Sequence, residues 1–141
     1  MPLRPSATVE SMNARTGRNL PGVFDVSVTE LSEGRLVMQY AIKPEFLAPN
    51  GFLHAASVIA VADTACGYAT IAHLPDGAGN FTTIELKTNF LGTATEGMVR
   101  AVATAAHLGR TTQVWDALIT HVDTGRTLAL FRCTQMILWP K

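Results

Sequence analysis

The stretch HAASVIAVADTACGYATIAHL, residues 54–74, decides the fold. Asp63 is its only acidic side chain, and it contains no lysine or arginine. Helical spacing leaves no polar face, and a helix that is apolar all round is usually buried. An ionised carboxylate that is buried costs on the order of several kcal/mol unless it is paired or its pKa shifts. The stretch therefore predicts a buried central helix whose one carboxylate has either a catalytic role or a buried hydrogen-bonding role.

Segments that alternate apolar and polar residues flank this helix, two before it and four after it. The expected strands are residues 24–30, 35–42, 81–90, 97–107, 111–121 and 126–138. Their connectors carry turn residues, and Asp123-Thr124-Gly125 is typical of a hairpin. Hairpin-connected strands form antiparallel sheets. A helix of about 20 residues spans roughly 30 Å, which is comparable to the width of six strands. We therefore predict an α+β fold in which a curved antiparallel sheet of about six strands wraps around one long central helix.

A helix that is buried on every side needs more cover than one sheet face supplies, so the same pattern predicts a homodimer. Residues 1–22 are punctuated by proline and glycine. We expect them to form an N-terminal extension with a short helix over 7–16, capped by Ser6. The length of 141 residues fits a single domain spanning 1–141.

Composition narrows the class of protein. Hydrophobic residues make up 48% of the chain, charged residues 16%, and the formal net charge is zero, which indicates a sizeable core and does not favour nucleic-acid binding. The N-terminus has no apolar signal region, and the longest apolar stretch is interrupted by Asp63, so no membrane span is expected. Cys66 and Cys133 lack metal-ligand spacing and are expected to be free thiols in a reducing, cytoplasmic compartment.

The histidines likewise form no set with metal-ligand spacing, so no metal or other cofactor is expected. His73, His107 and His121 are expected at surface or strand positions.

The start of the predicted helix carries a second chemical feature. Early helix N–H groups have no intrahelical partner and carry partial positive charge, and the small Ala55 and Ala56 leave them accessible. Such donors can polarise a carbonyl and hold an oxyanion. Asp63 lies eight residues later, about 12 Å along the axis, too far for one carbonyl to meet both groups of the same helix. If both act on one substrate, Asp63 must come from a partner helix at a dimer interface.

Several motifs of the chain resemble those of the hotdog-fold thioesterases, specifically the phenylacetate-degradation (PaaI-like) acyl-CoA thioesterases. They are Gly51–Ala56, Ala62–Gly67, Leu74-Pro75, Thr82–Leu91, Gly97, Gly109-Arg110 and Asp123–Arg126. The resemblance covers about residues 20–138. It implies a hydrolase that acts on acyl-CoA thioesters.

The resemblance also implies roles for individual residues. Asp63 matches the general base or nucleophile, and the Ala55 N–H matches the oxyanion donor. His54 matches a histidine that supports the helix start. Thr83 matches a residue that positions water or the carboxylate across the dimer. The expected substrate-binding residues are Asn50, Gly51, Ala56, Gly67, Tyr68 and Arg110, of which Arg110 would contact a CoA phosphate.

Two positions depart from the family pattern. The family commonly has His-Gly-Gly where this chain has His54-Ala55-Ala56. A backbone N–H survives the change from glycine to alanine, so the oxyanion role requires only a negative φ at this position. The family also often has an asparagine or glutamine 15 residues before the acid, and this chain has Ala48 there. Asn50, in the same turn, is the candidate substitute.

These observations leave three hypotheses for function. The first is hydrolysis of acyl-CoA thioesters by a homodimer that assembles further to a homotetramer, as the family often does. The second is an acyl-thioester hydratase or dehydratase on the same fold, which needs a paired histidine and acid. The third is a non-catalytic acyl-CoA-binding module, which the alanines at 48, 55 and 56 favour. The sequence does not identify the acyl group, although the apolar lining suits aromatic or medium-length chains.

Overall fold

The computed structural model describes residues 2–141. Two short helices, α1 (Val9–Asn13) and α2 (Leu20–Phe24), precede a long one, α3 (Ala55–Ala72), with a 3-10 turn, η1 (Pro44–Phe46), between them. The strands are β1 (Ser27–Ser32), β2 (Arg35–Ala41), β3 (Asn80–Phe90), β4 (Met98–Leu108), β5 (Thr112–His121) and β6 (Thr127–Leu138). Two strands, one long helix and four strands therefore follow in the expected order.

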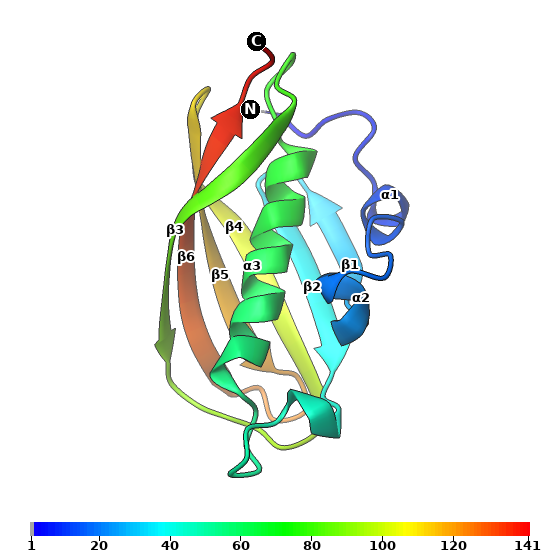
Figure 1. The fold of residues 1–141 in the computed structure, drawn as a ribbon, viewed down its shortest axis with the longest axis vertical. Coiled ribbons are helices and arrows are strands. Elements are labelled where there is room, and N and C mark those ends of the chain that lie inside the picture. The colour runs from blue at the N-terminus through cyan, green and yellow to red at the C-terminus, as the bar shows by residue number, and fades with distance from the viewer. Residues whose placement is uncertain (1) are drawn as a thin grey trace.

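The six strands form one antiparallel sheet in the order β1-β2-β4-β5-β6-β3. The sheet curves around α3, which lies along its concave face (Figure 1). This confirms the predicted architecture. β3, which follows α3 in the chain, pairs with the C-terminal strand β6 and forms one edge of the sheet. Its other edge has no neighbouring strand within residues 2–141.

The core lies between α3 and the inner side chains of the sheet. Val61, Ala65 and Ala69 of the helix are fully buried, as are Met38 and Trp115 of the strands. Alternation along the strands places every second side chain of β5 and β6 against the helix. Small residues on the helix allow the curved sheet to approach it closely.

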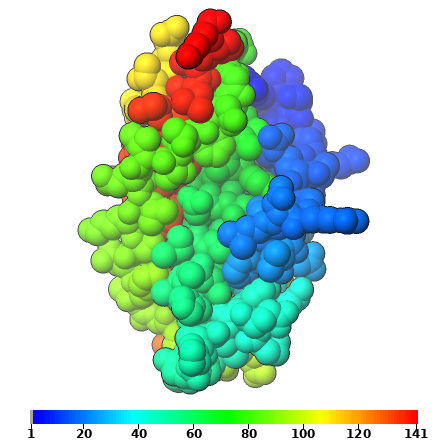
Figure 2. Space-filling view, in the orientation of Figure 1, coloured from blue at the N-terminus to red at the C-terminus, as the bar shows by residue number. Residues whose placement is uncertain are grey.

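One side of α3 is less covered than the sequence predicts. Ala55 and Ala56 are exposed, and Ile59, Ala60 and Asp63 are half-buried. In Figure 2 part of α3 reaches the surface between the N-terminal helices and the β3 side of the molecule. The helix has the length and hydropathy of a membrane span, but 61% of it is buried inside this domain, as expected for a core helix. The uncovered strip is what a partner subunit would have to cover.

The N-terminal region differs from the expected one. α1 is shorter than the predicted helix over 7–16, because Thr8 rather than Ser6 caps it through a reciprocal capping box with Ser11. α2 was not predicted, because Pro21 and Gly22 are typical of turns and the helix is only about one turn long. Phe24, expected in the first strand, ends α2 instead.

The Phe24 ring packs 5.4 Å from Tyr40 and 4.4 Å from Phe46, between ring centroids. The first strand therefore begins at Ser27.

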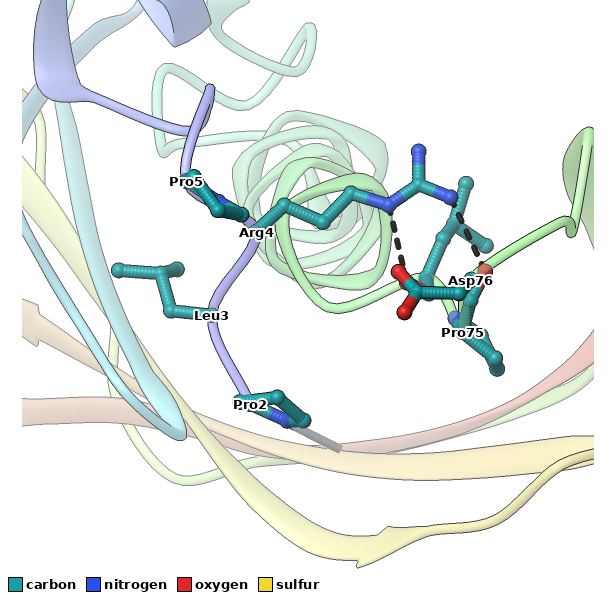
Figure 3. A pocket seen from close by; sticks show the side chains of 7 residues that line it. Pro2, Leu3, Arg4, Pro5, Pro75 and Asp76 are labelled. Carbon is teal, nitrogen blue, oxygen red and sulfur yellow. Dashed lines mark hydrogen bonds between the residues drawn. The ribbon is translucent and has the colours of Figure 1, made fainter.

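Arg4 joins the N-terminal segment to the C-terminal end of α3. Its guanidinium donates hydrogen bonds to the carbonyl oxygens of Leu74 (2.9 Å), Pro75 (3.0 Å) and Ala78 (3.3 Å), and its backbone N–H donates to Ala72. Figure 3 shows the side chain reaching across this end of the helix. The cation binds carbonyls of the loop that follows α3 and lies where the helix dipole is negative, while the backbone N–H of Arg4 pairs the last carbonyl of the helix, which a helix terminus leaves unpaired. A hollow of about 440 Å³ beside it is lined by residues 2–5 and 74–76.

Replacing Arg4 by alanine is expected to lower the free energy of unfolding by about 2 kcal/mol, because hydrogen bonds from a charged donor to three carbonyls are lost. Urea denaturation of R4A measures this. R15A is the matched control, since Arg15 is exposed and its side chain makes no hydrogen bond or ion pair within residues 2–141. Equal stability of R4A and R15A would show that the Arg4 contacts contribute nothing.

His73 was expected at a surface or strand position, and this is wrong: the residue ends α3 and is fully buried. Its Nδ1–H donates to the Ala69 carbonyl at 2.7 Å, and its Nε2 accepts from the Gly34 N–H at 2.9 Å. Its ring lies 5.2 Å from the Trp115 ring, centroid to centroid. Helical spacing does not predict the burial of His73, because its Gly34 partner belongs to the turn between β1 and β2, far away in the sequence. The contacts require a neutral imidazole, whose Nε2 is an acceptor.

The stability of the fold is expected to fall below about pH 6.5. Burial lowers the pKa of His73 from 6.5. A lowered folded-state pKa gives stability that is present above the unfolded value and is lost as pH falls toward the folded value. The loss approaches about 1.4 kcal/mol per pH unit. Urea midpoints from pH 8 to pH 5 should therefore fall more steeply for wild type and for H107Q than for H73Q. Identical slopes for H73Q and H107Q would contradict the prediction.

Candidate functional site

The N-terminal end of α3 holds one unpaired backbone donor. His54 caps the helix: its Nδ1 accepts from the Ala56 N–H at 2.9 Å, and its carbonyl accepts from the N–H groups of Ser57 and Val58. Within residues 2–141 the Ala55 N–H has no hydrogen-bond partner. Ala55 does not have a positive φ, because Asp25 is the one described non-glycine residue that does. The N–H therefore carries the partial positive charge of the helix terminus and is available to an acceptor.

A surface cleft of about 470 Å³ opens at this helix end. It is lined by Ala48, Asn50, Phe52, Leu53, His54, Ala55, Phe90, Gly92 and Thr93. The first six belong to the loop and helix start, and the last three follow from the end of β3. The cleft is mostly apolar, with polar groups converging at the helix terminus, which is the usual character of a ligand site.

The loop before α3 is held rigidly. The Ala48 N–H donates to the Phe52 carbonyl at 2.7 Å, and the Gly51 N–H donates to the Ala48 carbonyl at 2.9 Å. Gly51 adopts φ +88°, a conformation that favours glycine. The Asn50 side-chain oxygen accepts from the Phe52 N–H at 3.1 Å. This contact leaves the Asn50 amide N–H₂ as the group that can donate into the cleft.

His54 is fixed in one tautomer by its cap. Because Nδ1 accepts a hydrogen bond, the ring proton of the neutral form is on Nε2. His54 lies in the cleft wall beside Ala55. Its ring therefore orients the helix start and presents a second donor to the cleft.

Asp63 does not reach this cleft. It lies two turns further along α3, and it is absent from the cleft lining. Its Oδ1 is buried and has no hydrogen-bond partner within residues 2–141. Burial raises the pKa of the carboxyl above its usual 3.8. No other acidic or basic side chain lies between Ala55 and Ala72. The structure thus leaves a carboxylate without compensation at the uncovered side of the helix.

Thr83 lies on β3 and faces the interior. Its hydroxyl donates to Gln135 Oε1 at 2.7 Å, and Gln135 is fully buried on β6. A bulge follows Thr83 in the pairing of β3 with β6. Gly67, expected to bind substrate, packs against Phe81: a Cβ on Gly67 would lie 3.2 Å from the Phe81 ring.

The remaining predicted site residues are dispersed. Ala56 is exposed in the first turn of α3. Tyr68 is buried in the main core, and its position five residues after Asp63 places it on a different side of the helix. Arg110 follows β4, at the end of the domain opposite the cleft, and its guanidinium lies 4.5 Å above the Trp139 ring. Among residues 2–141 no group of three or more histidine, cysteine, aspartate or glutamate side chains is arranged to hold a metal ion.

The wall that β3 contributes to the cleft, Phe90 with the following Gly92 and Thr93, was not predicted from the sequence. The alternation of β3 indicates which of its side chains face inward, but nothing in the sequence indicates that the end of β3 lies beside the start of α3.

The chain is similar in sequence to known thioesterases. The sequence profile of the family described as "Thioesterase superfamily" matches residues 50–128. The 1,4-dihydroxy-2-naphthoyl-CoA hydrolase of Escherichia coli K12 is 28% identical over 134 residues, which cover 93% of this chain and 95% of that protein. The hydrolase of the same name from Listeria monocytogenes is 28% identical over 115 residues, covering 82% and 92%.

Solved structures show the same fold. The crystal structure of a glutamine-to-alanine variant of the thioesterase PA1618 from Pseudomonas aeruginosa has a TM-score of 0.91 at 25% identity, covering 98% of this chain and 99% of that chain. A glutamine-to-alanine variant of the Staphylococcus aureus thioesterase SAV0944 has a TM-score of 0.80 at 28% identity, covering 84% and 98%. A second SAV0944 structure has a glutamate replaced by alanine, 15 positions after that glutamine. In this chain Ala48 lies 15 positions before Asp63.

Proposed function

This chain belongs to the thioesterase superfamily and has its hotdog fold, and on that premise we propose that it hydrolyses acyl-CoA thioesters to the free acid and CoA. The observation that carries the proposal is the unpaired Ala55 N–H at the positive end of α3, which opens into an apolar cleft. The two curated relatives described above, which are named as hydrolases of an acyl-CoA, support the same reaction class.

The Ala55 N–H is the proposed oxyanion donor. A thioester carbonyl in the cleft accepts its hydrogen bond, and the bond strengthens as negative charge develops on the oxygen. The His54 Nε2–H and the Asn50 amide are the neighbouring donors. The alanine that replaces the family's glycine keeps the N–H, and its ordinary φ satisfies the condition set by the sequence.

The general base must come from a second subunit. Asp63 is about 12 Å along the helix from Ala55, farther than one carbonyl group spans. We propose that the Asp63 carboxylate of the partner takes a proton from water while the water oxygen attacks the carbonyl carbon. The tetrahedral intermediate then expels the CoA thiolate, which takes up the proton. The raised pKa of Asp63 suits this role, since a stronger base accepts the proton more readily. Direct attack by the carboxylate, which forms a mixed anhydride, is the alternative.

The packing of α3 against β3 supports a specific dimer. Gly67 lies against Phe81, and the two elements run in opposite directions (Figure 1). α3 rises about 1.5 Å per residue and β3 about 3.3 Å. Counting from this contact, Asp63 is level with Thr83, and Ala55 is level with about residues 86–87.

A two-fold axis that brings the partner's Asp63 to Ala55 must pass at the height midway between these two residues along α3. That height is the height of Ile59. Ile59 lies about 12 Å from Gly67 along the helix, and the same distance along β3 ends near Glu85. Glu85 is the midpoint of β3, Asn80–Phe90. An axis at this height therefore also pairs the whole of β3 with the partner's β3. Assembly of the site and complete pairing of the strand thus require the same axis.

The edge formed by β3 has the character of an interface. Its eleven residues have no neighbouring strand on one side within residues 2–141, and long exposed edges otherwise promote aggregation. Ile84, Leu86 and Phe90 expose 52%, 42% and 46% of their surface, and Leu91 after the strand exposes 60%. A partner strand would satisfy the backbone groups and cover these side chains.

A second apolar surface supports a homotetramer. Leu118 of β5 and Leu130, Met136 and Leu138 of β6 are exposed on the convex side of the sheet, away from α3. We propose that two dimers associate through this surface. The reduced cysteines and the CoA substrate are consistent with a cytoplasmic, single-domain enzyme of the PaaI-like group.

Ala48 favours one alternative, a binding module. The S. aureus relative has a glutamine 15 positions before the glutamate, and this chain has no side-chain amide at that spacing. A protein that binds acyl-CoA but lacks a positioned water would have the same cleft. The hydratase alternative has no comparable support, because His54 is committed to capping α3.

Thiol detection with a panel of aromatic and medium-chain acyl-CoAs tests the proposal. We expect one CoA thiol released per thioester. The protein's own thiols should give no background, because Cys66 and Cys133 are buried and the pKa of Cys66 is raised by its contact with Cys133 and by burial. Ligand-induced thermal stabilisation without thiol release would establish the binding module instead.

A further inference from the structure

A second hollow continues the cleft at Ala55 toward the turn between β5 and β6. It has a volume of about 320 Å³, and it shares Phe52 and Thr93 with the cleft. The rest of its lining is polar or small and consists of Ala94, Thr95, Glu96, His121, Thr124 and Arg126. A ligand whose carbonyl lies at the Ala55 N–H can therefore extend over Phe52 and Thr93 into an open, polar hollow.

Gly92 allows Arg126 to reach the edge of the cleft. Gly92 lines the cleft, and its N–H donates to the Leu128 carbonyl of β6 at 3.1 Å. A Cβ on Gly92 would lie 2.9 Å from the Thr127 carbonyl oxygen and 3.6 Å from a terminal guanidinium nitrogen of Arg126. Because glycine has no side chain, the start of β6 and the Arg126 side chain can approach the cleft this closely.

The Arg126 guanidinium is free to bind an anion. Its backbone is fixed, since its carbonyl accepts from the His121 N–H at 2.8 Å and its N–H donates to the Thr124 hydroxyl oxygen at 3.4 Å. The residue is exposed, and its guanidinium makes no hydrogen bond or ion pair within residues 2–141. Among the described residues it is the one lysine or arginine that lines either hollow. The planar fork of a guanidinium matches the oxygens of a phosphate.

The two nearby carboxylates leave this cation unpaired. Asp123 accepts from the Met98 N–H at 2.9 Å and lies 3.4 Å from His121 Nε2. Glu96 lines the same hollow as Arg126 but forms no ion pair with it. Glu96 therefore does not occupy the guanidinium, and its charge opposes an anion that binds there.

We propose that Arg126 is a binding residue whose guanidinium binds the phosphate at the end of the pantetheine arm of the CoA thioester. This inference rests on the proposed function, because it starts from a thioester carbonyl at the Ala55 N–H. From that point the pantetheine arm runs over Phe52 and Thr93, and its phosphate lies in the open hollow, where water still reaches it. The acyl group then extends the other way, along the apolar wall at Phe90.

Arg110, which the sequence favours as the phosphate contact, is placed differently within the subunit. It follows β4 at the end of the domain opposite the cleft, and its guanidinium lies over the Trp139 ring. Arg126 comes from the β5–β6 connector, which the sequence identifies only as a hairpin turn. Its place beside Gly92 depends on the pairing of the segment after β3 with the start of β6.

Thioesters of one acyl group with CoA, phosphopantetheine and pantetheine separate this role from a structural one. The first two carry the phosphate, and the third lacks it. We expect R126Q to raise KM about tenfold for the first two with kcat unchanged, because this contact is the same in the ground state and the transition state. KM for the pantetheine thioester should equal that of wild type. An equal change for all three substrates, a change for the CoA thioester alone, or no change for any would overturn the proposal.

Two further variants check the sign of the effect. E96Q should lower KM for the CoA thioester about twofold, because it removes a negative charge from the hollow. R18Q is the matched control, since Arg18 is exposed and its side chain makes no hydrogen bond or ion pair within residues 2–141. The effect of R126Q should shrink at about 0.5 M NaCl, because salt screens exposed charges. An R18Q variant with the same rise in KM as R126Q would show that only net charge matters.

Calorimetric titration with desulfo-CoA, which has no sulfur to acylate, tests the contact without hydrolysis. R126Q should raise the Kd of desulfo-CoA about tenfold and leave the Kd of pantetheine unchanged. Equal Kd values of desulfo-CoA for wild type and R126Q would overturn this inference, even in an active thioesterase. Conversely, if wild type binds desulfo-CoA through Arg126 but releases no thiol from any thioester, the proposed hydrolysis fails and the phosphate contact stands.

Discussion

Replacing Asp63 by asparagine is expected to lower kcat for acyl-CoA hydrolysis about a thousandfold, while the protein stays folded. Loss of a general base typically costs on the order of 10² to 10⁴ in rate. The substitution keeps the size of the side chain and removes its charge. Because burial raises the pKa of Asp63, ionisation of the carboxyl at neutral pH destabilises the fold, and D63N should melt no lower than wild type. Thiol release and a thermal melt measure the two effects.

The control for this variant is D25N. Asp25 is exposed and adopts φ 53°, a left-handed conformation that asparagine tolerates well. D25N should keep full activity. The acid limb of the wild-type rate profile should lie above pH 3.8, since protonation of Asp63 removes the base. A D63N variant as active as D25N would exclude Asp63 from the reaction.

Replacing Leu86 by lysine is expected to produce monomers and to reduce activity more than a hundredfold. Leu86 lies on β3, faces the helix side and exposes 42% of its surface in the single chain. It is next to the proposed two-fold axis near Glu85, so two introduced ammonium groups would face each other across the interface. Like charges and lost apolar burial both oppose association. Since each site takes Asp63 from one subunit and Ala55 from the other, a monomer has no complete site.

Sedimentation velocity and the thiol assay on the same L86K sample check this prediction. L20K is the matched control, because Leu20 on α2 exposes 59% of its surface on the side of α3 away from β3 (Figure 1). L20K should remain associated and active. A monomeric L86K that retained full activity would contradict the composite site, and an unchanged assembly would contradict pairing through β3.

The sequence predicted most secondary structure within a few residues, because its apolar spacing is unambiguous. Buried and less buried side chains alternate along most of β4, β5 and β6, and α3 is apolar over five turns. Where local pattern and tertiary packing differ, the prediction was wrong. Phe24 continues an alternating run in the sequence, but it ends α2 because its ring packs on Tyr40 and Phe46. In the sequence His73 looks like an ordinary polar residue at the end of a helix. In the structure it is buried, and its Nε2 accepts a hydrogen bond from the N–H of Gly34, 39 residues away.

The sequence by itself determined that one carboxylate lies within an apolar helix and that eight residues separate it from the helix start. Those two facts follow from composition and from the fixed rise of a helix, which need no tertiary information. Only the tertiary structure decided which N–H at the start of α3 is unpaired and that the end of β3 forms a wall of the cleft. These depend on segments far apart in the chain that come together only when the sheet closes around α3, and local periodicity carries no information about such contacts.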